Sequence, residues 1–250
     1  RGLRVVAAVD GRCPVDASQF DVFPYALETA ATGRAAVTPA LAGATLERLL
    51  MVVPHEDFHN QPEAQRAPPS LAEAAAMLAG FVTAAGFARD RFGAETSPEH
   101  AIVQHLEAEA DLFARKAGIV NGYFDEVAAL YAAYRATRDV DNAAVARDAA
   151  VAQDAPGAQD AAVTHDAALD RKRVLFRELQ QACLGSGARP VSFNQCPAVL
   201  NNAGLAFDRT YTRDYPDVYA QAQRHGADVA AIIRGLRETL ARSVPARSGP

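Results

Sequence analysis

Residues 55–89 read HEDFHNQPEAQRAPPSLAEAAAMLAGFVTAAGFAR, and the predicted fold is built outward from this stretch. It begins with His-Glu-x-x-His, continues through a proline-rich loop and ends in a long alanine-rich run. Apolar residues in that run recur at helical spacing, which predicts a helix over Ser70–Arg89. The side chains expected to face inward are those of Leu71, Met77, Leu78 and Phe81.

The flanking sequence extends the helical pattern and adds a small β element at the start. Leu3–Val9 and Arg34–Leu41 are short apolar runs that predict strands. The predicted helices are Ala44–Val53, one or two within Pro98–Ala136, Ala168–Cys183 and Pro216–Arg242. The fold class is therefore mainly α (α+β), in one domain over residues 1–250. Its predicted parts are a β-rich segment (1–42), a helical core (43–136), a low-complexity insertion (143–168) and a C-terminal helical part (169–250).

Composition and charge argue against nucleic-acid binding and against a membrane-spanning segment. Half of the residues are apolar and 22% are charged, as is usual for a globular chain. A net charge of −5 argues against nucleic-acid binding, which needs a basic face. The longest apolar runs, such as Leu49–Pro54, are too short to span a bilayer, so no transmembrane segment is expected. The opening Arg1-Gly-Leu-Arg resembles an internal start, so any leader would already have been removed or would not be part of this sequence.

The cysteines and one repeat leave open questions about compartment and surface. Cys183 and Cys196 flank a segment rich in Gly, Ser and Pro that could let them form a disulfide, which would indicate an oxidising compartment. Two buried free thiols are an equal alternative. Four hexads that each begin with Asp-Ala, at Asp148, Asp154, Asp160 and Asp166, match neither helix nor strand periodicity. They predict a mobile, low-complexity surface insertion with no catalytic role.

The His-Glu-x-x-His motif carries the predicted chemistry. His55 and His59 are four residues apart, so on a helix both imidazoles lie on one face and can bind one zinc ion. Zinc lowers the pKa of bound water to roughly 7, and Glu56 is placed to act as the general base. Two neighbours count against the motif. Asp57 puts a charge where zinc helices usually carry a neutral residue, and Pro54 should kink the helix or begin a new one.

A catalytic zinc ion needs a third protein ligand. The acidic candidates downstream are Glu63, Glu73, Asp90, Glu95 and Glu99. Glu63 is so close to His59 that the chain would have to fold back too sharply. Glu73 lies in the first turn of the next helix, where it can face both histidines. The competing interpretation is a capping box, in which Glu73 bonds the backbone amide of Ser70. With the histidine motif present, the ligand role is favoured.

HEDFHNQ and the following EAAAMLAGFVTAAGFAR resemble the predicted bacterial aminopeptidases of the Glu-zincin clan, in which His-Glu-x-x-His precedes Glu-x-x-Ala on a second helix. Residues 199–219, VLNNAGLAFDRTYTRDYPDVY, are similar to that family's Asn-Asn-Ala run with a following tyrosine and Pro-x-Tyr/Phe element. The resemblance covers Val37–Arg89 and Arg173–Leu240. It implies a zincin-like helical domain, metal ligands at His55, His59 and Glu73, and Glu56 as base. No motif that would clasp a substrate's amino terminus is present, so aminopeptidase specificity comes from the family alone.

Hydrolysis of a peptide creates an oxyanion that an O–H or N–H donor should stabilise. Tyr211 is the predicted donor and Tyr215 the second choice, although either could be an ordinary core tyrosine. Asn201 and Asn202 could hold a substrate backbone, but asparagine pairs more often cap helices.

The leading function is a zinc-dependent peptidase acting on peptide substrates. The alternatives are a non-catalytic helical binding or scaffold protein, such as a pseudo-peptidase that retains the metal site, and a metal-binding protein without hydrolase activity. The resemblance favours the periplasm or cell envelope, with the cytoplasm as the alternative. His100 and His105 are expected on different sides of a helix and in solvent.

Overall fold

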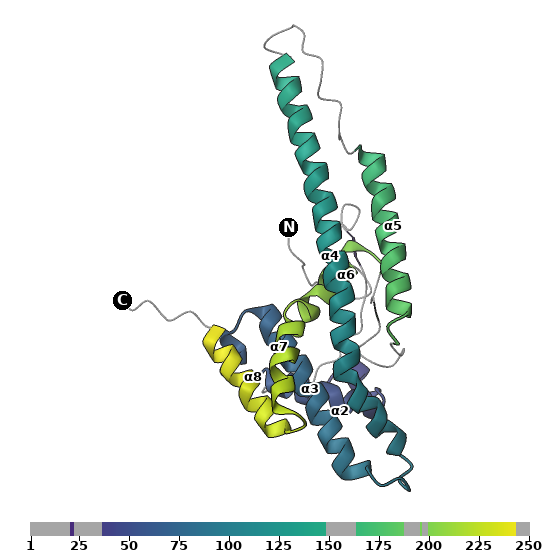
Figure 1. The fold of residues 1–250 in the computed structure, drawn as a ribbon, viewed down its shortest axis with the longest axis vertical. Helices are drawn as coiled ribbons and strands as arrows, with labels where there is room; N and C mark the ends of the chain where they lie inside the picture. The colour runs from purple at the N-terminus through teal and green to yellow at the C-terminus, as the bar shows by residue number, and fades with distance from the viewer. Residues whose placement is uncertain (1–20, 23–36, 149–163, 188–195, 197–199, 244–250) are drawn as a thin grey trace, which may run out of the picture.

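The structure, a computed structural model, describes residues 21–22, 37–148, 164–187, 196 and 200–243, with the side chains of 139–148 left out. These residues are mainly helical, and no strand occurs among them (Figure 1). The elements are α1 (Pro39–Ala42), α2 (Leu46–Phe58), η1 (Ala64–Arg66), α3 (Pro69–Phe92), α4 (His100–Asp148), α5 (His165–Leu184), α6 (Asn202–Thr212), α7 (Tyr215–Ala222), η2 (Gln223–His225) and α8 (Val229–Ser243).

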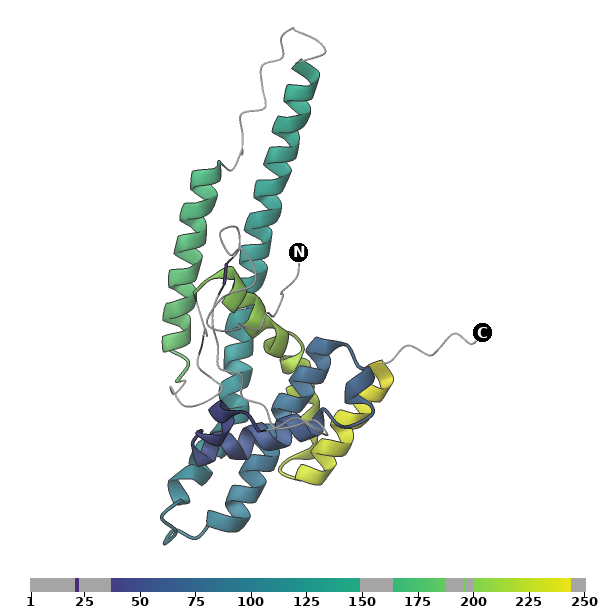
Figure 2. The same ribbon diagram turned by 180° about the vertical axis from the view of Figure 1, so that it is seen from behind.

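Helix α3 is the centre of the molecule. It contacts α2, α4, α6, α7 and α8, whereas α5 packs on α4 (Figure 2). Helix α4 is 49 residues long, and its carboxyl-terminal half extends beyond the main body next to α5. The fold therefore has a helical body around α3 and a projecting pair of helices, α4 and α5.

Two apolar cores correspond to these two parts. The core around α3 includes Met77, Leu78 and Phe81, as the helical spacing predicted, while Leu71 packs partly buried at its edge. Each fully buried side chain of this size stabilises the fold by about 1.5–3 kcal/mol. The second core joins α4, α5 and α6 through Val120, Val127, Leu175, Phe176, Leu179 and Leu205.

Helix α3 is long and apolar enough to cross a membrane by length and composition, with a mean hydropathy of 1.6 over 18 residues. In the structure 61% of that window is buried inside the fold. A central core helix passes the same test, and five other helices cover α3. This candidate span was not expected from the length of the uninterrupted apolar runs.

The structure corrects several predicted boundaries. Of the strand expected over Arg34–Leu41, Pro39 to Leu41 are instead helical in α1, while Leu3–Val9 lies outside the described residues. The single helix expected over Pro216–Arg242 is wrong. It is divided into α7, η2 and α8, and Gly226 separates the last two at a φ of 58°, a conformation that favours glycine.

The helices next to the repeat are longer than predicted. Helix α4 continues to Asp148 and α5 begins at His165, so both enter the stretch 143–168 expected to be an insertion. The central part of the repeat, residues 149–163, lies outside the described residues.

Candidate metal centre

Helix α2 brings the histidine pair to the surface of α3. Thr45 caps its amino terminus by accepting a hydrogen bond from the amide of Arg48 at 3.3 Å. The helix continues through Pro54, so no new helix begins there. His55 lies in the last turn and is 7% exposed, and His59 follows as the C-cap with helical φ and ψ. Both imidazoles are therefore presented from the same turn.

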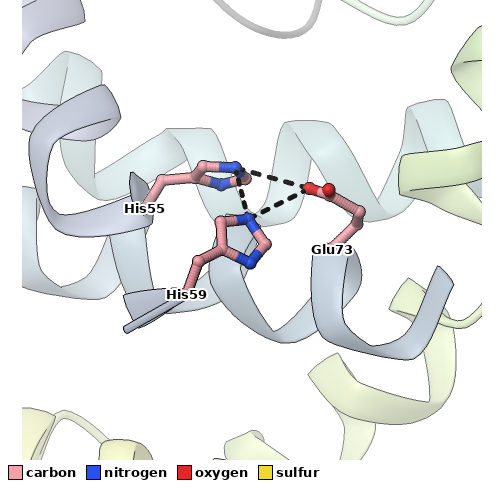
Figure 3. A group of neighbouring side chains, drawn as sticks. All are labelled: His55, His59 and Glu73. Atoms are coloured by element: carbon pink, nitrogen blue, oxygen red, sulfur yellow. Dashed lines mark hydrogen bonds and ion pairs between the residues drawn. The ribbon is translucent and has the colours of Figure 1, made fainter. Parts of the chain in front are cut away.

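His55, His59 and Glu73 converge on one point (Figure 3). The two Nε2 atoms are 3.3 Å apart, and Glu73 Oε2 lies 3.4 Å from His55 Nε2 and 3.3 Å from His59 Nε2. In a regular tetrahedron the edge is about 1.63 times the distance from centre to corner, so the centre would lie about 2.0–2.1 Å from each atom. Zinc–imidazole bonds are about 2.0–2.1 Å long. The three atoms thus have the spacing of one face of a tetrahedral metal site.

The local structure at Glu73 does not form the capping box. Helix α3 begins at Pro69 with Pro68 as N-cap, and no side chain caps it. Ser70 instead donates a short hydrogen bond to Asp214 Oδ2. Glu73 Oε2 is buried and makes no conventional hydrogen bond, because its two contacts with imidazole nitrogens are long for such bonds. This oxygen is a buried acceptor without a strong donor, as expected for a metal ligand.

The electrostatics of the triad favour a charged carboxylate. Burial raises the pKa of Glu73, but the close contacts with both histidines and their charge outweigh burial and lower the pKa to about 2. Burial lowers the pKa of His59, and contacts with Glu73 together with the charge of Glu56 raise it overall above 6.5. Glu73 is therefore ionised at neutral pH, which is the state that binds a cation.

Gly80 allows α2 and α3 to approach closely beside His55. A Cβ at Gly80 would lie 2.7 Å from the carbonyl oxygen of Met51 and 3.2 Å from His55 Cβ. Since 2.7 Å is shorter than any real contact of this kind and the Met51 oxygen belongs to the backbone, a side chain here would push the helices apart. The sequence analysis did not single out Gly80. Its signal is a glycine seven residues after Glu73, two helical turns along the same face.

Glu56 and Asp57 differ in their surroundings. Glu56 is half-buried, and its charge contributes to the raised pKa of His59, which places the carboxylate near the triad. Asp57 is exposed, so its charge is solvated. A solvated charge has little effect on the buried triad, and the objection that Asp57 raised against the motif is weakened.

The two candidate tyrosines have different positions. Tyr211, on α6, is half-buried, and its ring centroid lies 6.5 Å from that of His55 with a tilt of 39°. Tyr215 is fully buried and donates a hydrogen bond to the carbonyl oxygen of Ala110 at 3.2 Å. Burial raises the pKa of Tyr215 well above its usual value. Tyr215 is thus a core tyrosine, and Tyr211 is the one beside the triad.

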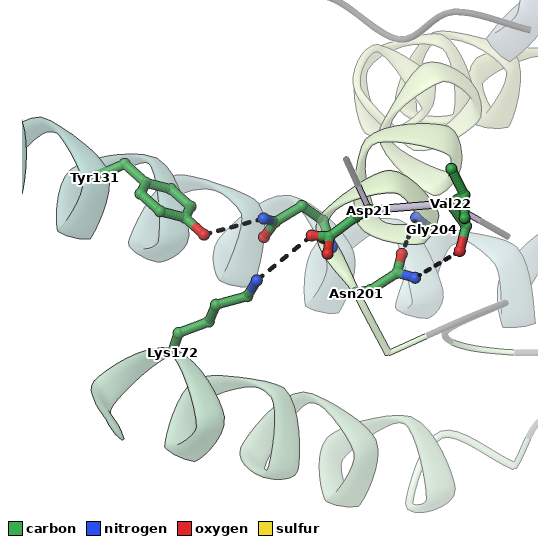
Figure 4. A network of polar contacts seen from close by, with 7 residues as sticks. Asp21, Val22, Tyr131, Lys172, Asn201 and Gly204 are labelled. Atoms are coloured by element: carbon green, nitrogen blue, oxygen red, sulfur yellow. Dashed lines mark hydrogen bonds and ion pairs between the residues drawn. The ribbon is translucent and has the colours of Figure 1, made fainter. Parts of the chain in front are cut away.

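The asparagine pair anchors the amino terminus of α6 (Figure 4). Asn201 is the N-cap and accepts from the amide of Gly204 at 2.9 Å, and its Nδ2 donates to the carbonyl oxygen of Val22 at 3.1 Å. The amide of Asn202 donates to the carboxylate of Asp21 at 3.1 Å. Asn201 therefore agrees with the capping interpretation, whereas the side chain of Asn202 donates to the Tyr131 hydroxyl at 2.9 Å.

Two other polar groups are engaged away from the triad. His105 was expected in solvent, and its side chain is 42% exposed, while its Nδ1 lies 2.6 Å from Glu47 Oε1. His100 is half-buried. Glu63, the rejected ligand candidate, accepts hydrogen bonds from two guanidinium nitrogens of Arg237 at 3.0 and 3.3 Å. This pair connects the loop after His59 to α8.

Cys183 and Cys196 are joined by a disulfide, which decides between the two possibilities that the sequence left open. Cys183, in the last turn of α5, belongs to the second apolar core, and Cys196 packs against the same core.

Within the described residues, His55, His59 and Glu73 form the one group of three or more histidine, cysteine or acidic side chains that could hold a metal ion. Imidazole and carboxylate together suit a first-row transition metal. Comparison with known proteins found no matching family model, no matching curated protein and no matching solved structure.

Proposed function

We propose that this chain is a zinc-dependent peptidase in which His55, His59 and Glu73 hold the metal. The observation that supports this most strongly is the triangle of ligand atoms with edges of 3.3, 3.4 and 3.3 Å. Two neutral imidazoles and one carboxylate, with a fourth position left for water, form a known type of catalytic zinc site. The partly exposed side chains of His59 and Glu73, at 22% and 25%, leave the site open to substrate.

When bound, zinc would polarise the substrate carbonyl and lower the pKa of water to about 7. Glu56, adjacent to His55 and half-buried, takes the proton from the attacking water and then gives it to the leaving amine. Tyr211 donates its phenolic proton in a hydrogen bond to the oxyanion that forms when the carbonyl is attacked. The chain itself thus provides an acid–base group and an oxyanion donor on α2 and α6.

The proposal also includes a peptide substrate and a relationship to the Glu-zincin aminopeptidases. Both are supported by the sequence resemblance described above. A periplasmic or cell-envelope location is supported by the Cys183–Cys196 disulfide, because disulfides persist in oxidising compartments.

The test combines metal content with one isosteric substitution. Purified wild-type protein should contain one zinc per chain and cleave members of a peptide library. Glu56→Gln cannot accept a proton, so hydrolysis should fall by about 10²–10⁴ while zinc remains stoichiometric. Peptide hydrolysis by the Glu56→Gln variant at the wild-type rate would contradict the proposal.

The second candidate is a metal-binding protein without hydrolase activity, since the triad itself does not require Glu56. Stoichiometric zinc with no cleavage by the wild type would favour it. A chain that binds no zinc at all would favour the scaffold interpretation.

A further inference from the structure

Three polar ties connect the segment around Tyr211 to the body of the fold. The first is the ion pair between Lys116 Nζ on α4 and Asp208 Oδ1 on α6, at 2.9 Å. Their side chains are only 6% and 5% exposed. Asp208 comes three residues before Tyr211, so the tie lies one helical turn away from it.

The second tie follows Tyr211 directly. Asn121 on α4 donates from Nδ2 to the carbonyl oxygens of Thr212 and Arg213, at 2.9 and 3.3 Å. Its Oδ1 accepts from the hydroxyl of Thr212 at 2.9 Å, and Thr212 is fully buried. One asparagine thus holds both the backbone and the side chain at the end of α6.

The third tie connects this segment to the helix that carries Glu73. Ser70 donates to Asp214 Oδ2. Ser70 lies one turn before Glu73 on α3, and Asp214 lies three residues after Tyr211. The end of α6 is therefore attached both to α4 and to the turn of α3 next to the metal ligand.

Stability alone does not require these buried polar contacts. A buried ion pair can often be replaced by apolar side chains of similar volume without loss of stability, whereas its directional bonds specify one arrangement. Apolar packing would tolerate a rotation of α6 about its axis, and one residue of rotation turns a side chain by about 100°. Such a rotation would carry the Tyr211 ring away from His55.

We propose that Lys116–Asp208, Asn121 and Ser70–Asp214 are positioning residues that hold the Tyr211 phenol at the metal centre. This inference rests on the proposed function, because it assigns Tyr211 the role of oxyanion donor. The contacts described above for the positioning residues are with one another and with the end of α6 and the residues that follow it. They act by fixing the rotation of α6 about its axis and how closely α6 packs on α4 and α3.

Asn121→Ala is the main test variant, since it removes the second tie without leaving a buried charge. Thr239→Val is the matched control. Thr239 on α8 also joins two helices, because its hydroxyl donates to Gln221 Oε1 on α7 at 2.8 Å; its other bond, to the Gly235 carbonyl at 2.9 Å, stays within α8. Ser70→Ala is the second variant, with Ser70→Thr as its conservative rescue.

The kinetic readout is a double-mutant cycle with Tyr211→Phe. Loss of an oxyanion donor costs about 10²–10³ in kcat, so Tyr211→Phe should fall in that range. Asn121→Ala should lower kcat about tenfold in the wild type and leave kcat unchanged in the Tyr211→Phe background, because there is no phenol left to position. Thr239→Val should leave kcat unchanged in both.

The second readout needs no hydrolysis. The chain has seven tyrosines, so fluorotyrosine labelling gives a simple fluorine spectrum in which Tyr211→Phe identifies one signal. Co²⁺ bound at the triad should produce a large paramagnetic shift of that signal. The shift should shrink in Asn121→Ala and Ser70→Ala, and return in Ser70→Thr.

The outcomes separate the two proposals. If the wild type binds no Co²⁺, the metal centre is wrong and the positioning role falls with it. If Co²⁺ binds and the Tyr211 signal shifts equally in wild type and Asn121→Ala, the positioning role is overturned while the metal centre stands. Equal slowing by Asn121→Ala in both kinetic backgrounds would likewise show a merely structural role.

Discussion

Gly80 lies against His55 so closely that a Cβ on the glycine would be 3.2 Å from the histidine Cβ and 2.7 Å from the Met51 carbonyl oxygen. This contact sets the separation of α2 and α3 at the level of the triad. Two ligand atoms come from the α2 segment and one comes from α3. The helix separation therefore determines whether the distances from Glu73 Oε2 to His55 Nε2 and His59 Nε2 stay at 3.4 and 3.3 Å.

Gly80→Ala should therefore weaken metal binding and the fold together. Overpacking of this kind typically costs about 1–3 kcal/mol, and the displaced helix should lower zinc affinity at least tenfold. Gly118→Ala on α4 is the control, since beyond its chain neighbours and the backbone of its own helix turn no atom lies within 4 Å of its added Cβ. That substitution should stabilise the chain by about 0.5–1 kcal/mol and leave zinc affinity unchanged. Thermal unfolding and zinc titration measure both effects. Wild-type affinity in Gly80→Ala would show that the helix separation is not critical.

The sequence predicted the triad because its members lie on two adjacent helices with strong periodic signals. His55 and His59 share one turn, and Glu73 follows after a proline-rich reversal, so the local pattern contained most of the geometry. The close approach at Gly80 is a property of two packed surfaces, which a periodic pattern along one helix does not show. A new helix beginning at Pro54, one of the two expected effects, does not occur for a similar reason, because packing of α2 on α3 maintains one helix through the proline.

The carboxyl-terminal part was less predictable. Periodicity merged α7 and α8 into one helix, since apolar residues continue at similar spacing across the break. Gly226 was the available signal, and its positive φ marks the end of η2. The Cys183–Cys196 pairing could not be settled from spacing, because it depends on where α5 ends relative to a later segment. A capping role was one interpretation of Asn201, but helix α6, which Asn201 caps, was not predicted.

Glu73→Ala should remove zinc from the protein. Loss of a residue that only supports a metal ligand typically lowers metal affinity 10- to 100-fold, and loss of one of three protein ligands should lower zinc affinity by at least as much. Glu63→Ala is the matched control, because this nearby acid pairs with Arg237 on α8. Its zinc content should match that of the wild type. The readouts are metal analysis after dialysis and the rise in melting temperature on adding zinc. Zinc retention by Glu73→Ala together with loss in Glu63→Ala would reverse the ligand assignment.

The disulfide should stabilise the fold without affecting the metal. Cys183 and Cys196 are 13 residues apart, and a loop of about this length is worth about 3 kcal/mol in the chain-entropy model. Cys183→Ala combined with Cys196→Ala should therefore lower the melting temperature by several degrees, with zinc content unchanged. Intact mass before and after reduction should confirm the bridge in protein from an oxidising compartment. An unchanged melting temperature in the double variant would show that the bridge adds no stability.

Removal of residues 149–163, replaced by a short Gly-Ser linker, should leave fold and metal site intact. The deletion keeps Thr164, which caps α5 by accepting from the amide of Ala167 at 3.2 Å, and it keeps His165, whose Nδ1 lies 3.2 Å from the Tyr134 hydroxyl. Loop closure costs only about 0.6 kcal/mol for each doubling of length, so shortening the connection changes stability little.

The comparison variant for this deletion is Leu175→Ala. Leu175 is 1% exposed in the core between α4 and α5, and its truncation should cost about 2–5 kcal/mol. If α5 is held by that core and not by the repeat, the deletion variant should melt within a few degrees of the wild type and bind zinc equally, whereas Leu175→Ala should melt clearly lower. A deletion variant that melts as low as Leu175→Ala, or without cooperativity, would make the repeat part of the folded core.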